Sequence, residues 1–288
     1  MGIYKADMAA DIYRLKASNK NILDLTGRRD AAQNDFVAES IAVKLKLKKE
    51  TVLVDIGCGD GRFLESAHQS GVDPFSGRLV GILPNIEEVL RVLEHLALRP
   101  NPDSRFISIF KGDATETGLP SSYADILVCN GVLQGWGMTL EYVESALVEF
   151  NRVISPSSQV DESANYDDGV LFIGELPDSN ELASRPYGDS IFGWLWWVLL
   201  NQGFKEFMSR MHQVFRSVTG KENLIIVPKS HFHSTPEEFA ELLRRNGFTK
   251  ITYSKSIEID RTGRKRESAT RWDYLAIKER LRQSPEVQ

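Results

Sequence analysis

The segment Val52–Leu64, VLVDIGCGDGRFL, contains the residues whose types and spacing are best suited to chemistry. An apolar run stops at Asp55 and enters a turn in which Gly57, Gly59 and Gly61 alternate with other residues. Glycines let the chain turn sharply and let a ligand approach the backbone closely. A helix that follows would offer free N–H groups and the positive end of its dipole. A ligand with a carboxylate therefore suits this place.

Two better-known glycine loops do not fit the spacing. The dinucleotide pattern G-x-G-x-x-G needs a glycine where Arg62 stands, and the Gly-Lys-Ser/Thr of the P-loop is absent. The remaining acid-x-G-x-G-x-G phrase resembles motif I of the class I S-adenosylmethionine-dependent methyltransferases, whose loop wraps the amino-acid end of the cofactor. A tight turn in another α/β protein is the alternative. The resemblance implies S-adenosylmethionine as cofactor and a first set of binding residues, namely Asp55, Gly57, Cys58, Gly59 and Gly61.

Further binding residues are expected where other strands end, because ligands bind beyond the carboxyl ends of strands in an open parallel sheet. By the same resemblance, Asp113 accepts a hydrogen bond from the adenine amine, and Ala114 presents its backbone N–H to the ring. Asp113 could instead cap a turn. The resemblance also places Asn130, Gly131 and Leu133 near the methionine moiety and the reacting methyl group.

The end of the second strand departs from the family pattern. The family commonly has an acid there that binds the ribose hydroxyls, but this chain has Leu83, followed by Pro84. We expect both residues to border the cofactor, although leucine cannot accept those hydrogen bonds. Asn85 or Glu87 could substitute, backbone and water could hold the ribose, or cofactor binding could be weak or altered.

Methyl transfer from a sulfonium is a direct displacement that needs alignment, a dry site and, for a hydroxyl acceptor, a base. The candidate bases are His231, His233 and Glu175. The two histidines alternate, so both would face one side of an extended segment. Surface or capping histidines explain the pattern equally well. We expect no metal, because no third ligand matches the two histidines.

Composition limits the class of protein. The 288 residues are 42% hydrophobic and 26% charged, which is typical of a soluble globular protein. A net charge of −5 argues against a general nucleic-acid binder. Two cysteines and no apolar leader predict a cytoplasmic protein without a disulfide framework. The most apolar run, Ile191–Leu200, is too short to span a bilayer, so neither nucleic acid nor membrane is expected as a partner.

Strands and helices alternate after an N-terminal helical region, which predicts helices on both faces of a parallel sheet. The fold class expected is an α/β, Rossmann-like three-layer sandwich. By the resemblance, its seven-stranded sheet is mostly parallel, with an antiparallel last strand beside the fifth. Asn85, with Glu88 at N3, is expected to cap the helix after the second strand, and a capping box at Thr235-Pro-Glu-Glu238 begins a late helix. A glycine-containing turn at Arg261–Arg266 is expected between the last two strands. The predicted strands are Thr51–Ile56, Leu79–Leu83, Arg105–Phe110, Ala124–Asn130, Gly169–Glu175, Ile251–Ile257 and Trp272–Ile277.

The domain division that we expect is an N-terminal helical cap over residues 1–48, a methyltransferase domain over 49–278 and a tail over 279–288. Residues 177–234 form a helical lid insertion within the domain, much longer than a connection requires. Its aromatic residues could pack, wall the acceptor or form a dimer surface.

These features predict an enzyme that transfers a methyl group to an oxygen or nitrogen of a small-molecule acceptor. A homodimer is a candidate assembly. The alternatives are a catalytically silent member that binds cofactor or a partner, which Leu83 favours, and a different transfer on the same fold.

Overall fold

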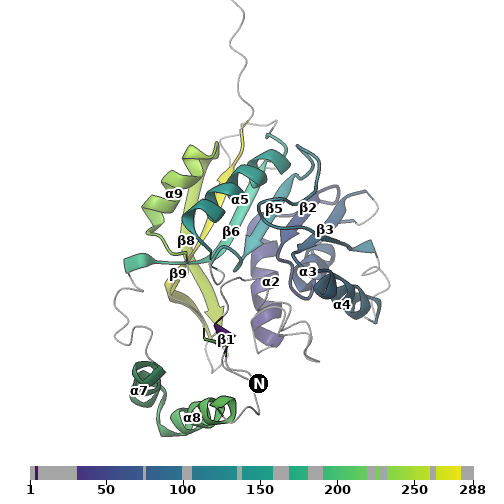
Figure 1. The fold of residues 1–288 in the computed structure, drawn as a ribbon. Coiled ribbons are helices and arrows are strands. Elements are labelled where there is room, and N and C mark those ends of the chain that lie inside the picture. Colours follow the sequence, from purple (N-terminus) through teal and green to yellow (C-terminus); the bar gives the residue numbers. More distant parts are fainter. Residues whose placement is uncertain are drawn as a thin grey trace, which may run out of the picture.

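A computed structural model of the chain describes residues 4–5, 31–73, 76–98, 106–134, 138–157, 169–180, 191–218, 225–226, 232–259 and 264–279 (Figure 1). The predicted calls on His231 and on the helical region before Ala31 lie outside these residues. The helix that is described there, α2, spans Ala31–Leu45. The division into cap, domain and tail stays a prediction.

A seven-stranded sheet forms the middle of the fold, in the order β4-β3-β2-β5-β6-β9-β8. Neighbouring strands from β4 to β6 run parallel, whereas β9 runs antiparallel to both β6 and β8. The predicted fold class is therefore confirmed, including the insertion of the last strand beside the fifth. The strands are β2 (Val52–Ile56), β3 (Arg78–Leu83), β4 (Ser108–Lys111), β5 (Ile126–Asn130), β6 (Val170–Pro177), β8 (Thr249–Ile259) and β9 (Lys265–Ile277).

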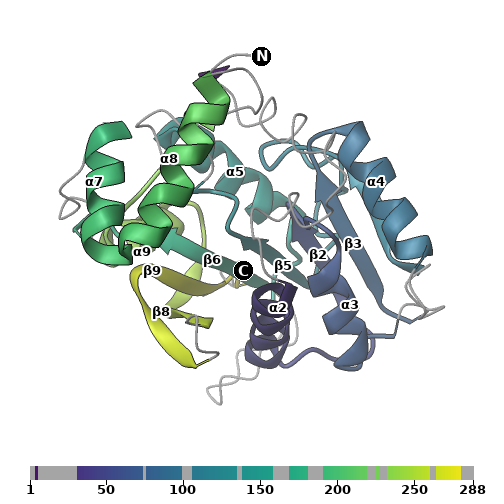
Figure 2. The same ribbon diagram turned by 90° about the horizontal axis from the view of Figure 1, so that it is seen from below.

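Helices cover both faces of the sheet (Figures 1 and 2). One buried cluster joins the strands to α5 (Leu140–Val153) and α9 (Pro236–Arg245). The other joins them to α2, α3 (Arg62–Gln69) and α4 (Ile86–Ala97). Strand residues alternate between the clusters, as a period of two requires, with Val54 in the first and Leu53 in the second. Central strands buried on both faces read as continuous apolar runs.

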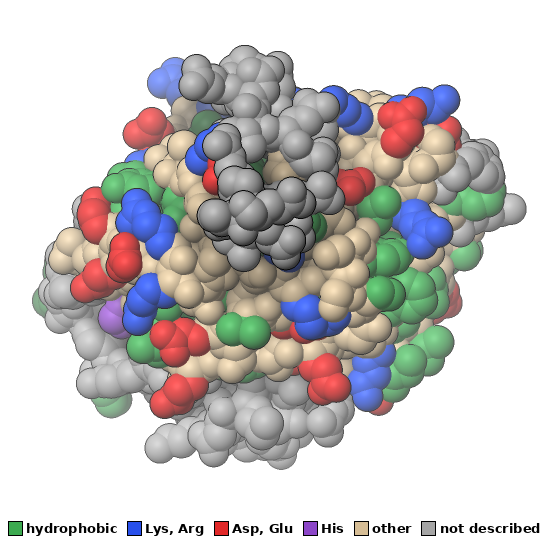
Figure 3. All heavy atoms as spheres, turned by 90° about the horizontal axis from the view of Figure 1, so that it is seen from above, with side chains coloured by type: hydrophobic (Ala, Val, Ile, Leu, Met, Phe, Trp, Pro, Cys, Tyr) green, Lys and Arg blue, Asp and Glu red, His purple; other side chains and the backbone are tan. Residues whose placement is uncertain are grey.

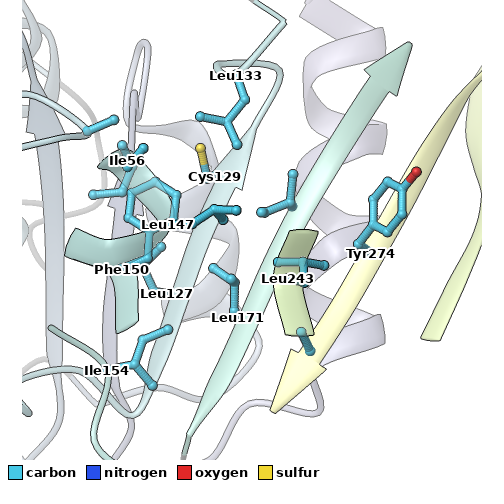
Figure 4. Packing of buried hydrophobic residues seen from close by; sticks show 14 of the residues in the cluster. Ile56, Leu127, Cys129, Leu133, Leu147, Phe150, Ile154, Leu171, Leu243 and Tyr274 are labelled. Carbon is cyan, nitrogen blue, oxygen red and sulfur yellow. The ribbon is translucent and has the colours of Figure 1, made fainter. Parts of the chain in front are cut away.

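The core on the α5–α9 side is made of interlocking aliphatic and aromatic side chains (Figure 4). Phe150 of α5 and Leu127 and Leu171 of the sheet are fully buried. Tyr274 of β9 packs edge-on against Phe239 of α9, with ring centroids 4.7 Å apart. This contact packs α9 against β9, which lies between β6 and β8.

One predicted helix start agrees with the structure and another differs. The predicted capping box of α9 is present, with Thr235 and Glu238 bonded reciprocally. Asn85 occupies the N-cap of α4, but its side chain makes no capping bond and donates instead to Glu88 Oε2 at 2.9 Å. The predicted capping box at Asn85 is therefore wrong. The turn expected at 261–266 is also shorter, because Lys265 and Arg266 already belong to β9.

Two further helices follow β6, as the aromatic spacing predicts: α7 (Ile191–Gln202) and α8 (Phe204–Val218). They pack as a hairpin below the sheet in Figure 1. A short parallel pair, β1 (Tyr4–Lys5) with β7 (Ile225–Ile226), was not anticipated. Of the described helices, none is long and apolar enough to cross a membrane.

Glu149 of α5 is a buried carboxylate that ties the helix to the loop before β5. It accepts hydrogen bonds from Thr117 Oγ1 at 2.6 Å and from Arg152 Nε at 2.7 Å. Burial opposes ionisation of Glu149, but the bonds from Arg152 and Thr117 outweigh it and lower its pKa. A lowered folded-state pKa stabilises the fold above the ordinary glutamate range, and the contribution is lost as the pH falls through the folded value.

We therefore expect Glu149→Gln to lower the free energy of unfolding at neutral pH by about 1.5–3 kcal/mol, the range for charged hydrogen bonds. The deficit against the wild type should shrink as the pH falls below the ordinary glutamate range. Urea unfolding of both proteins across acid pH measures this, with Glu144→Gln on the same helix as control. A deficit that does not change with pH would contradict the charge-based account.

Candidate functional site

The glycine loop lies where β2 ends, at the carboxyl edge of the parallel strands that Figure 2 views from below. Gly57, Gly59 and Gly61 all have left-handed backbone, with φ of 70°, 58° and 79°. Side chains are disfavoured in this region, so the turn depends on glycine. A Cβ built on Gly57 would overlap Val132 Cγ2, which brings the loop after β5 against the glycine loop. Gly61 is the N-cap of α3 and makes no side-chain capping bond.

Two buried carboxyl groups flank the loop. Asp55 is 4% exposed and Asp60 is 2% exposed. Burial, together with the charge of Asp60, raises the pKa of Asp55 well above its usual range. Asp60 accepts from Arg62 Nε at 3.1 Å, and no described residue is recorded as a hydrogen-bond donor to Asp55. Asp55 is thus a buried carboxyl group with no hydrogen-bond or ion-pair partner given by the described residues, and a bound cation would favour its charged form.

The helix that follows β3 contains a buried acid, Glu88, which was not among the binding residues predicted from the sequence. Leu83 is 3% exposed and belongs to the apolar cluster on the α2–α4 side. Glu88, in the first turn of α4, is 1% exposed and accepts the Asn85 bond. Burial, then Asp55 and Asp60, and then Glu88 raise the pKa of the Cys58 thiol, so Glu88 lies within electrostatic reach of the glycine loop. Glu87, the substitute considered from sequence, is exposed.

Asp113 lies after β4 and is held by three hydrogen bonds to its Oδ1 atom. The donors are Thr115 N at 3.0 Å, Thr115 Oγ1 at 2.8 Å and the Tyr142 hydroxyl at 2.9 Å. Burial and then the Asp113 charge raise the pKa of Tyr142, so the phenol stays a donor. Asp113 therefore caps a turn, and its Oδ2 receives no recorded bond from described residues. Ala114 beside it is 4% exposed and packs in the core.

Two variants can separate the turn-capping role of Asp113 from its predicted contact with the adenine. We expect Asp113→Ala to weaken S-adenosylmethionine binding by about 1–3 kcal/mol, the cost of an unsatisfied buried partner, and to lower the melting temperature. Tyr142→Phe removes one bond to Oδ1 and the acceptor of the Ala114 backbone bond but keeps the Asp113 carboxylate, so it should lower the melting temperature and leave affinity unchanged. Calorimetry and thermal melts of both variants measure this. A change in melting temperature alone for Asp113→Ala would make the residue purely structural.

The ends of β5 and β6 lie side by side, with Gly131 N donating to Gly174 O at 3.0 Å. A Cβ on Gly174 would overlap Asn130 Oδ1, so glycine is needed there. A Cβ on Gly131, whose φ is 70°, would lie 3.5 Å from Glu175 Oε2. Leu133 is 1% exposed in the core. Asn130, Gly131 and Glu175 therefore meet at one place on the carboxyl edge.

Glu175 has an unusual backbone. Its φ of 61° is left-handed, and it lies in the register shift between Ile173 and Leu176. A non-glycine residue in this region is strained, and such strain concentrates at functional sites. Its N–H donates to Asp273 Oδ1 at 3.1 Å, and its Oε2 accepts from Arg271 Nη1 at 3.0 Å. Two residues of β9 thus hold Glu175, Asp273 at its backbone and Arg271 at its carboxylate.

Asp273 connects four elements around this place. Besides Glu175 N, it accepts from Ser256 Oγ of β8 and from Lys44 Nζ of α2, each at 2.5 Å. A cavity of about 20 Å³ lies beside it, which is room for about one water molecule. Asn130, Glu175 and Asp273 line the cavity together with residues of α2 and β8. Helix α2 is thereby tied to this part of the carboxyl edge.

His233 is exposed and its Nδ1 lies 3.2 Å from Ser179 Oγ. The flanking Ser234 N donates to Pro177 O at 3.2 Å, which places this segment beside the end of β6. No contact joins His233 to Glu175 or Asn130 in the part of the chain that is described. Across the same residues, no three His, Cys, Asp or Glu side chains gather as a metal site would require.

Residues 54–160 match the family model of the methyltransferase domain. Over these residues the chain is similar to methyltransferase domains, and its sheet has the α/β methyltransferase-like fold. Solved structures of low identity share its fold. A chain of the Haloferax volcanii complex with the Trm112 methyltransferase activator is 12% identical with a TM-score of 0.60, covering 96% of this chain and 100% of its own. The comparison with curated proteins gives no match.

Two other structures show how widely the domain's fold is used. An S-adenosylmethionine-dependent methyltransferase of Methanosarcina mazei is 17% identical with a TM-score of 0.51, covering 82% of this chain and 96% of its own. The cyclase SpnF is 15% identical with a TM-score of 0.53, covering 88% and 77%. At these identities the likeness concerns the fold alone.

The structure adds three residues to those found from sequence: Glu88, Arg271 and Asp273. Glu88 looks like an ordinary helix-capping acid in sequence. Arg271 and Asp273 have a stronger signal, because charged side chains are unusual in a strand expected between two others.

Proposed function

We propose that this protein transfers a methyl group from S-adenosylmethionine to an oxygen or nitrogen of a small-molecule acceptor. The observation that carries the proposal is the row of left-handed glycines after an acid at the carboxyl end of β2. In an open α/β sheet this is the position at which ligands bind. The match to the methyltransferase domain begins at Val54, one residue before that acid.

The residues at this edge fit the cofactor. The backbone of Gly57, Gly59 and Gly61 leaves room for close approach. The positive dipole end of α3 favours a carboxylate, and of its first N–H groups that of Arg62 already donates to Asp60 Oδ1 at 3.3 Å. Asp55 supplies a buried negative charge for the ammonium group of the same amino-acid end. Asp113 would accept a hydrogen bond from the adenine amine, and the backbone N–H of Ala114 would face the ring. Leu83 and Pro84 would border the cofactor.

The ribose requires a hydrogen-bond acceptor that Leu83 does not offer. We assign this role to Glu88 with Asn85, because they are bonded to each other and Glu88 is electrostatically close to the glycine loop. Glu88→Gln should then weaken cofactor binding about tenfold, the effect of one charge-assisted bond. Unchanged affinity in a folded Glu88→Gln protein would mean that backbone groups and water, and not Glu88, hold the ribose.

Bound S-adenosylmethionine supplies an electrophilic methyl group on a sulfonium. The chain's own task is to align the acceptor and hold its proton. Glu175 is the best-placed base, because its carboxylate lies beside Gly131 and Arg271 holds it in position. His231 and His233 are the second choice and would act from the segment before α9.

Residues 177–234 remain our candidate for the acceptor lid. They leave from β6 beside Glu175 and return beside Pro177 at Ser234, so the segment begins and ends at the acceptor side. A segment of this length and apolar content could exclude water from a displacement reaction.

The test has two stages. Calorimetry with S-adenosylmethionine and S-adenosylhomocysteine should show one site per chain in the wild-type protein. Release of S-adenosylhomocysteine is then measured against a panel of small hydroxyl and amine compounds, with Glu175→Gln, His233→Asn and His231→Asn compared. A base is expected to contribute about 10²–10⁴-fold in rate without a matching change in cofactor affinity. Absence of cofactor binding by the wild type would refute the proposal.

A catalytically silent member is the second candidate, and buried Leu83 is the observation that favours it. Such a protein would bind S-adenosylhomocysteine yet release none with any acceptor. One solved relative of the fold was crystallised with a methyltransferase activator, so a protein partner is a further proposal for this chain, as is a homodimer.

A further inference from the structure

The α7–α8 hairpin stands apart from the three layers of the fold. In Figures 1 and 2 it lies on the carboxyl-edge side of the sheet, outside α5 and α9. Its two helices pack on each other, with Leu195 and Val198 of α7 buried at 4% and 1% exposure. The hairpin is therefore a unit of its own at the side of the molecule where the cofactor and acceptor are expected.

Each helix of the hairpin exposes a stripe of large apolar side chains. In α7 the stripe has a spacing of four residues, and in α8 it follows the three-and-four spacing of one helix face. Monomeric proteins scatter such residues singly, whereas a contiguous group marks an interaction surface. The exposed residues are Phe192 (84%), Trp196 (61%), Leu200 (67%), Phe204 (67%), Met208 (49%), Met211 (42%) and Phe215 (65%).

The charge of the hairpin differs from that of the chain. No residue of α7 is charged. The sequence of α8 has three cations and one anion, so the hairpin carries a formal +2; they are Lys205, Arg210, Arg216 and Glu206. The whole chain carries −5, which leaves −7 for the remainder. Basic and acidic side chains are interspersed on the opposite face of the molecule (Figure 3). A cationic unit with exposed aromatic side chains thus projects from an acidic protein.

We propose that the α7–α8 hairpin docks on the surface of an anionic lipid bilayer. Aromatic and aliphatic side chains on helices with neighbouring Lys and Arg are the composition that binds in the headgroup region. The cations are attracted to anionic headgroups, to which an acidic protein without this unit would not be drawn. The proposal goes beyond the proposed function and replaces our expectation that no membrane takes part.

The hairpin would lie on the bilayer and not cross it. Twelve residues of α7 extend about 18 Å, against a hydrocarbon core of about 30 Å. A second copy of the chain is the competing occupant. The uncharged α7 favours lipid, because specific protein interfaces add polar and charged rim contacts to their apolar centre.

The proposal is tested by flotation of the full-length protein with vesicles of phosphatidylcholine, alone or with about 30% phosphatidylserine, the charge range in which surface attraction operates. The wild type should float with the anionic vesicles and be released at high salt. Phe192→Ser/Trp196→Ser should reduce the bound fraction about tenfold or more, because interfacial binding scales with buried apolar area. Leu90→Ser on α4 is the matched control, since Leu90 is as exposed as Trp196 at 61%.

Circular dichroism and cofactor calorimetry of the double variant show whether the fold and the cofactor site are intact. Because flotation needs neither cofactor nor acceptor, its failure is distinguishable from failure of the proposed function. The proposal is overturned if the wild type does not float with anionic vesicles, or if the double variant floats as well as the wild type. Light scattering that shows a dimer dissolved by Phe192→Ser/Trp196→Ser, without flotation, would assign the surface to a second copy.

Discussion

Gly59→Val should fold and lose S-adenosylmethionine affinity by about 100-fold or more. Gly59 has a φ of 58°, in the region that β-branched residues disfavour by about 1–2 kcal/mol. That cost is small beside a total stability of about 5–15 kcal/mol, so the protein should remain folded. The valine side chain would occupy the space in which the ligand meets the backbone. Calorimetry on the folded variant measures the loss.

The control for strain is Gly71→Val. Gly71 also has positive φ, 114°, and nothing lies within 4 Å of its built Cβ. This variant should lose stability and keep cofactor affinity. If Gly59→Val binds as tightly as the wild type while remaining folded, the glycine loop is a structural turn and the cofactor site lies elsewhere.

Asp55→Asn should raise the free energy of unfolding and weaken cofactor binding in the same protein. Burial, with the neighbouring Asp60, raises the pKa of Asp55, so the folded state disfavours its charged form. Such a group costs no stability at acid pH, and the penalty grows as the pH rises from the ordinary aspartate range toward the folded value. The neutral isostere removes the penalty, and it also removes the charge for the cofactor's ammonium group, worth about 1.5–3 kcal/mol.

Denaturant unfolding across pH and calorimetry at neutral pH measure both effects. The stability gain of Asp55→Asn over the wild type should be largest at neutral pH and vanish at low pH. Glu94→Gln in α4, an exposed position, serves as a surface control. A variant that loses both stability and affinity would show that Asp55 has a structural partner, against its assignment to the ligand.

The parts of this molecule that the sequence predicts are those coded locally. The glycine loop, the alternating strands and the Thr235 capping box depend on residues within a few positions of one another, and the structure has them as expected. The position of β9 was anticipated through resemblance and not through local pattern. Which polar side chains meet at the strand ends is decided by tertiary contacts, which a local sequence pattern does not show.

The polar contacts at the site were missed because they join distant positions. Glu175 N and Asp273 are 98 residues apart, and Lys44 and Asp273 are 229 apart. Asn85 was expected to cap a helix, yet its side chain turns to Glu88 where an acid is buried near the loop. The left-handed backbone of Glu175 arises from the register shift in β6, for which its sequence has no glycine signal.

The central claim is that the loop after β2 binds S-adenosylmethionine. A crystal structure of the protein with S-adenosylhomocysteine tests it most directly. We predict the ligand's carboxylate at the start of α3, its amino group toward Asp55 and its adenine beside Asp113 and Ala114. A ligand bound at another place, or a glycine loop left empty by saturating ligand, would contradict the account.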